Sequence, residues 1–124
     1  MTPQLRVYLE IYKRISNLGY DVYDYLPNSE ASYPFVHIGE MQSPDRYTKT
    51  SVFGEVYQTI NIYHHYKNMG DLMNMSGEVK AILRGLQIPN MKLILNDIDE
   101  QILNDSTTSE VLKRSLIDVH YTFY

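Results

Sequence analysis

Three histidines on three different predicted strands are the first side chains that could do chemistry. His37, His64 and His120 could in principle converge, and three imidazole ligands form a set that binds zinc or copper. His65 cannot join His64 at such a site, because adjacent residues of a regular strand point to opposite faces. No short ligand spacing supports this site, so a three-histidine metal centre is kept only as an alternative.

A group of carboxylates near the C-terminus is the second candidate for chemistry. Asp97 and Asp99 share a face of one predicted strand, Asp118 and His120 share a face of another, and the two strands are candidates for neighbours. A carboxylate–histidine set can perform acid–base catalysis or hold a divalent cation. The interpretation that we favour is the solvated face of an exposed hairpin.

The sequence carries no recognisable catalytic or phosphate-binding motif. G-x-G-x-x-G, G-x-x-x-x-G-K-[ST], G-x-S-x-G and H-E-x-x-H are all absent. The chain has no cysteine, which excludes disulfides and thiolate metal sites. We therefore predict a protein that is not an enzyme and that holds no cofactor and no metal.

Length and charge narrow the class of protein. At 124 residues the chain suits one domain, which we expect to span residues 1–124. The formal net charge is -4, whereas domains that hold nucleic acid by neutralising its phosphates are usually basic. The first residues lack the basic start and apolar core of a signal peptide, and no apolar run approaches the roughly 18 residues needed to span a bilayer. We expect a soluble protein, made in a cytoplasm, that binds no membrane.

Two amphipathic helices are predicted. Thr2-Pro3 is a favourable start for the first, and Gly19 ends it. Its broad apolar face consists of Leu5, Val7, Tyr8, Leu9, Ile11, Tyr12, Ile15 and Leu18. The second helix opens at Asn68 or Asp71 and stops at Ile88-Pro89. We interpret its methionines as gap-filling core residues: Met69, Met73 and Met75.

Five strands complete the predicted order α-β-β-β-α-β-β. They cover Tyr20–Leu26, Pro34–Met41, Val56–Tyr66, Met91–Leu103 and Val111–Tyr124. In the third, Val56, Ile60 and Ile62 are expected to face the core, while Tyr57 and Tyr63 point the other way. The last two strands are expected to form an antiparallel hairpin. The simplest packing is an α+β fold, with one mostly antiparallel sheet of about five strands and both helices on one face.

The polar stretch Gln42–Glu55 lacks a clear period, and we interpret it as a long loop or a hairpin arm. Connections of this length are usually functional or disordered. An arm could order against a neighbouring subunit, with Tyr47 and Phe53 as apolar anchors and Arg46 as a polar one.

Aromatic composition also favours contact with partners. The chain has twelve Tyr, three Phe and no Trp, and tyrosine is enriched at interfaces. For any single tyrosine, a half-buried strand position is the simpler interpretation. The predicted subunit-interface residues are Arg46, Tyr47, Phe53, Tyr57 and Tyr63.

The order of elements, together with a few residues, resembles a known family. The most specific part is Pro27 followed by Tyr33-Pro34-Phe35-Val36-His37-Ile38-Gly39, then the Val56–Tyr66 strand and the Gly70–Leu86 helix. This pattern resembles the tail terminator or tail completion (head–tail joining) proteins of long-tailed bacteriophages. The resemblance covers nearly the whole chain and rests on a pattern of elements, not on a catalytic signature.

The resemblance implies a virion protein, assembled in the host cytoplasm and located at the head-proximal end of the tail. Such a subunit forms a ring with copies of itself, typically a hexamer, which ends polymerisation of the major tail tube protein. The ring also offers a docking surface for the head, through a head-completion or connector protein. DNA passes through the lumen of such a ring without specific binding. We infer separately that an acidic lumen would ease that passage by repelling phosphates.

Two alternatives stay open at this point. The chain could be another virion connector, such as a head-completion protein, which only its partner distinguishes from a terminator. It could also be a small enzyme or a ligand- or metal-binding module with a pocket between sheet and helices. Convergence of His37, His64, Asp118 and His120 would favour the module.

Overall fold

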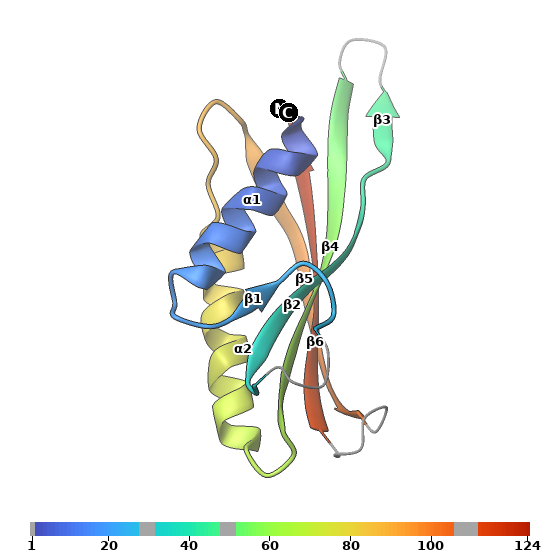
Figure 1. Cartoon of the computed structure of the whole chain (residues 1–124). Coiled ribbons are helices and arrows are strands. Elements are labelled where there is room, and N and C mark those ends of the chain that lie inside the picture. The colour runs from blue at the N-terminus through green and yellow to red at the C-terminus, as the bar shows by residue number, and fades with distance from the viewer. Residues whose placement is uncertain (1, 28–31, 48–51, 106–111) are drawn as a thin grey trace.

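Two helices lie on one face of a mixed sheet in the computed structural model, which describes residues 2–27, 32–47, 52–105 and 112–124 (Figure 1). The elements in chain order are α1 (Pro3–Ser16), β1 (Val22–Tyr23), β2 (Phe35–Gln42), β3 (Asp45–Tyr47), β4 (Val52–His65), α2 (Met69–Arg84), β5 (Leu93–Asp105) and β6 (Leu112–Phe123). No helix in these ranges is long and apolar enough to cross a membrane.

The strand order β1-β2-β4-β6-β5 defines one sheet, and β3 adds to β4 beyond the end of β2. Only the β1–β2 pair is parallel; every other pair is antiparallel. The predicted α+β class and the order α-β-β-β-α-β-β are confirmed, with β3 as a short additional strand inside the predicted arm. β5 and β6 form the predicted antiparallel hairpin.

The main core lies between the helices and the sheet. One stripe of each helix is fully buried: Val7, Ile11 and Ile15 on α1, and Leu72, Val79 and Leu83 on α2. The sheet contributes alternate residues: Val56, Ile60 and Ile62 from β4, and Ile117, Val119 and Tyr121 from β6. Complete burial of one such side chain is worth about 1.5–3 kcal/mol, so this layer is the main source of stability.

The apolar face of α1 is narrower than predicted. Leu5 and Leu9 are 43% and 42% exposed, because the helix presents only one stripe to the sheet and α2. The prediction that the α2 methionines are core residues holds for Met75 alone. Met69 and Met73 are 38% and 55% exposed, since they lie on the outer side of the helix.

The two helix starts differ in their capping. The Thr2 hydroxyl accepts a hydrogen bond from the backbone N–H of Leu5 at 3.1 Å, as the predicted start requires. Asn68 occupies the corresponding position of α2, but its side chain makes no capping bond. Gly19, past the end of α1, has φ +97°, a conformation that favours glycine.

Two buried hydrogen bonds tie α2 to β6. The Tyr121 hydroxyl donates to the Leu83 carbonyl at 2.6 Å, and burial raises the pKa of this phenol well above its usual range. The Ser76 hydroxyl, which is fully buried, donates to that of Ser115. These bonds satisfy polar groups that would otherwise be costly inside the core.

The strands differ from the predictions most in β1, β4 and β5, and the ends of β2 and β6 differ by one residue. β1 is only Val22–Tyr23, because it pairs with β2 through two residues. β4 begins at Val52, four residues before the predicted start, since β3 supplies a partner for the additional residues. A bulge between Leu95 and Asp97 reverses the alternation of β5, so that Leu95 and Ile98 both pack against the main core.

Candidate functional site

The predicted arm is a hairpin of β3 and the first part of β4. Asp45, Arg46 and Tyr47 pair with Gly54, Phe53 and Val52. β6 ends its pairing with β4 at Gly54, so the arm extends past the end of the main sheet (Figure 1). The side chains of Arg46 and Tyr47 lie outside what the structure describes, so their predicted role as anchors stays a prediction.

Phe53 lies at the base of this arm, beside the C-terminal residue. Its ring is half-buried and its centroid is 5.9 Å from that of Tyr124. The neighbouring Gly54 leaves room for the Phe123 ring, because a Cβ at position 54 would lie 2.2 Å from the Phe123 Cζ. The arm is therefore joined to the body through close packing of aromatic rings on glycine.

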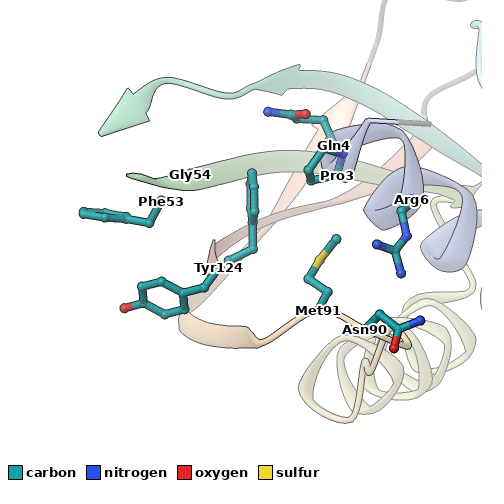
Figure 2. Close-up of a pocket in the computed structure, with 9 residues that line it drawn as sticks. Pro3, Gln4, Arg6, Phe53, Gly54, Asn90, Met91 and Tyr124 are labelled. Atoms are coloured by element: carbon teal, nitrogen blue, oxygen red, sulfur yellow. The ribbon is translucent and has the colours of Figure 1, made fainter. Parts of the chain in front are cut away.

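A cleft of about 410 Å³ opens at this end of the molecule (Figure 2). It is lined by Pro3, Gln4, Arg6, Phe53, Gly54, Asn90, Met91, Phe123 and Tyr124. The start of α1, the arm base, the α2–β5 connection and the C-terminal residue thus meet at one place. The lining is largely apolar, which is typical of a docking surface.

Polar contacts fix the walls of this end cleft. The Arg6 guanidinium donates to the Pro89 carbonyl, and the Gln4 amide donates to the Ser43 hydroxyl at 2.9 Å. Lys92 lies over the Tyr124 ring, 5.6 Å from its centroid. Arg6 supplies a cationic side chain to the lining, and Gln4 and Asn90 supply amides.

The face of the sheet opposite the helices, the open face, carries the predicted carboxylate group. Asp97 pairs with His120 and Asp99 with Asp118, so the structure brings together the four residues as predicted. Asp97, Asp99 and Asp118 are exposed, and they line a hollow of about 420 Å³. The exposure agrees with the favoured interpretation of a solvated hairpin face.

Tyr57 lies in the same hollow and stacks on His120, with ring centroids 4.0 Å apart and planes 10° from parallel. His120 Nε2 is 3.4 Å from a Glu55 carboxylate oxygen. The Thr59 hydroxyl donates to Asp118 at 2.8 Å. Tyr57 is 38% exposed, and its predicted interface role stays a prediction.

Tyr63 occupies a different setting on the open face. It is 8% exposed and belongs to a second small core with Phe35 and Leu112. The Phe35 and Tyr63 rings stack with centroids 5.1 Å apart, and Tyr33 lies 5.4 Å from Phe35. Packing within the chain therefore explains most of its burial, and its predicted interface role stays a prediction.

The histidines of the alternative metal site do not converge. His37 pairs with Asn61 and His120 with Tyr57, which are four residues, or roughly 13 Å, apart along β4. His64 points to the helix-covered face. Among the described residues, no group of three His, Cys, Asp or Glu side chains could hold a metal ion.

His64 is buried between β4 and the start of α2. Its Nε2 lies 3.6 Å from an Asp71 carboxylate oxygen, and its Nδ1 accepts the backbone N–H of His65 at 2.8 Å. Burial lowers the pKa of His64 more than the nearby Asp71 raises it. Burial lowers the pKa of His37 in the same way. Both rings therefore bind a proton less readily than an exposed histidine does.

Comparison with known proteins adds one finding. No family model matches the chain, and no curated protein matches it. A solved structure does match. The chain shares its fold with a protein in the virion of a native gene transfer agent particle. The TM-score is 0.69, and the match covers 98% of this chain and 95% of the other, at 15% sequence identity.

The end cleft was not predicted from the sequence, because its lining comes from four separate segments. Two local signals were present. Gly54 follows Val52-Phe53 within the stretch interpreted as a loop or hairpin arm, and glycine in a strand often marks close approach by another group. Asn90, with φ +61°, stands just after Pro89, where a turn residue is expected.

Proposed function

We propose that this protein is a structural component of a phage-like virion and that it has no catalytic activity. The observation that carries the proposal is the similarity of fold, over nearly all of both chains, to a protein of the gene transfer agent virion. Among the described residues, the histidines of the alternative metal site do not converge.

We further propose that the chain forms a ring, a hexamer, that caps the tail tube. The ring would end polymerisation of the major tail tube protein and give the head its docking surface. Support comes from the tail-terminator resemblance of the sequence and from the hairpin arm, which extends past the sheet. Contacts between two different surfaces of identical subunits generate rings when the rotation closes.

The open face is the surface that we place toward the lumen of this ring. Asp97, Asp99 and Asp118 are exposed there. Negative charge would repel DNA phosphates, so DNA would pass without being held. The expected position in the particle is the head-proximal end of the tail.

A head-completion or connector protein is the second candidate. The fold similarity supports it equally, because it points to a virion and not to one position within the virion. The two candidates differ in partner: a terminator binds the end of the tail tube, and a head-completion protein binds the portal side.

Polymerisation of the tail tube protein encoded in the same genome tests the proposal. The tube protein is assembled with and without this chain, and tube lengths and ends are measured by negative-stain imaging. Shorter tubes with a ring at one end are expected. Tubes of unchanged length and bare ends, together with binding to the head connector, would move the protein to the head-completion role.

Two variants sharpen this experiment. Deletion of Asp45–Ser51 removes β3 and is expected to leave the far-ultraviolet circular dichroism of the monomer nearly unchanged while weakening ring assembly. Wild-type capping by this deletion variant would show that the arm is not needed.

A specific enzymatic turnover that is lost when Asp118 and His120 are replaced would refute the non-catalytic proposal.

A further inference from the structure

The outer side of β5 is a long uncovered strand edge. β5 spans Leu93–Asp105, and its only strand neighbour in the described part of the chain is β6. The opposite edge of the sheet is different, since β1 covers the start of β2 with two residues. A free edge of 13 residues is a template for pairing with another chain unless something blocks it.

The charges on β5 decide which strand can pair with that edge. Leu93–Asp105 contains four carboxylates and no Lys or Arg: Asp97, Asp99, Glu100 and Asp105. Glu100 faces the helices, and its Oε1 forms an ion pair with Lys80 Nζ at 3.0 Å. Asp97 and Asp99 are exposed on the open face, and no cation of the described chain pairs with them. Like charges on adjacent strands are destabilising, so two copies of β5 do not suit each other.

The arm carries a strand whose charge is complementary to that of the acidic β5 edge. Between Gln42 and Phe53 the sequence has Arg46 and Lys49 against the single acid Asp45, with Lys49 outside the described residues. β3 pairs with β4 on one side, and no strand of the described chain pairs with its other side. β6 and β4 lie between this arm and the β5 edge of the same chain, so the two cannot meet within one molecule.

We infer that the free edge of β5 is a docking surface for the β3 arm of a second copy of this chain. The arm strand extends the sheet of its neighbour by backbone pairing, and Arg46 comes to lie beside Asp97 and Asp99. Addition of a strand to an exposed edge is a common mode of recognition between chains. The inference rests on the proposed ring function, because arm and edge are different surfaces and their contact is head-to-tail.

Disulfide trapping tests this contact. Because the chain has no cysteine of its own, only the introduced cysteines can form a bridge. Arg46→Cys is mixed with a chain carrying Asp97→Cys, Asp99→Cys or Gln101→Cys, which scan one face of the edge. A bridge requires Cα atoms about 4.4–6.8 Å apart, a separation that paired strands provide. We expect an interchain bridge at one of the three positions and a ladder of covalent multimers when both cysteines are in one chain.

Met73→Cys is the matched control, because its side chain is 55% exposed on α2, away from the β5 edge. It should give no bridge with Arg46→Cys.

Charge reversal supplies a second readout: Arg46→Glu should weaken self-association by about two- to fivefold. A partner chain carrying Asp99→Lys should restore it.

The outcomes separate this inference from the proposed function. Tubes that are capped by the wild-type chain, with no bridge at any edge position, would overturn the docking surface and leave the capping role intact. A ladder of covalent multimers from a chain that never alters tube length would support the docking surface and overturn the capping role. A chain that stays monomeric and forms no bridge at the highest concentration reached would also overturn the docking surface.

Discussion

Replacement of Gly54 by alanine tests how the arm is joined to the body. A Cβ at this position would lie 2.2 Å from Phe123 Cζ and 2.7 and 2.8 Å from its two Cε atoms. Carbon atoms do not approach so closely, so the Phe123 ring must leave its place. That ring is 7% exposed and belongs to the main core. The end cleft beside it is the space into which it can turn.

Two opposing effects determine how much Gly54→Ala changes the free energy of unfolding. Exposure of the Phe123 ring costs up to about 1.5–3 kcal/mol of unfolding free energy. Gly→Ala at a compatible backbone position stabilises by roughly 0.4–1 kcal/mol through the unfolded chain, and φ at Gly54 is not in the left-handed region. We expect a net loss of about 1–2 kcal/mol and a fall in Tm of roughly 3–10 °C.

Urea unfolding followed by far-ultraviolet circular dichroism measures this loss, and a double-mutant cycle assigns its cause. Phe123→Leu lacks the Cε and Cζ atoms that clash, so Gly54→Ala in that background should be neutral or stabilising by up to about 1 kcal/mol. Gly77→Ala is the control: it lies on the exposed side of α2 with nothing within 4 Å of its Cβ, and should stabilise by about 0.5–1 kcal/mol. An equal loss from Gly54→Ala in both backgrounds would refute the reasoning.

Three further predictions concern capping, buried hydrogen bonds and pH. Thr2→Ala should lower the unfolding free energy by about 1 kcal/mol in urea titration, because its hydroxyl caps α1. Asn68→Ala should cost clearly less, since Asn68 makes no capping bond, and equal losses would contradict the assignment. Ser76→Ala should cost about 1–3 kcal/mol by leaving the Ser115 hydroxyl buried and unpaired; the double alanine variant should recover much of this loss, and additive losses would argue against the bond. Burial lowers the pKa of His64, so the unfolded chain binds the proton first as pH falls, and stability should decrease from about pH 6.5 down to the folded pKa. The slope is at most about 1.4 kcal/mol per pH unit for this group, and unfolding titrations of His64→Gln between pH 5 and pH 7.5 should show a shallower dependence, while an unchanged one would contradict it.

The spacing of apolar residues along the sequence was sufficient to predict the two helices and the long strands. Val56, Ile60 and Ile62 alternate as a strand that is buried on one face must, and the structure places all three in the core. The burial of Tyr63 could not be predicted from that pattern. Tyr63 lies on the open face, and only pairing of β2 with β4 places the Phe35 ring against it.

Where the prediction failed, pairing between distant segments decided the structure. The first strand was expected over Tyr20–Leu26 because aromatic and branched residues favour strands, but only two residues find a partner. The bulge in β5 had a signal, since the apolar residues change parity between Leu95 and Ile98. The end cleft had only local hints, because its four segments meet through the fold and not along the chain.

The order of strands in the sheet has a consequence for the synthesis of the protein. β6 follows β5 along the chain, yet it lies between β4 and β5 and supplies Ile117, Val119 and Tyr121 to the core. A nascent chain that stops before residue 112 therefore lacks the strand that joins β4 to β5, and its helices lack the core residues of β6. We therefore expect native folding only after the residues through Phe123 have left the ribosome. Chains that lack β6 would present exposed apolar surface for proteolysis.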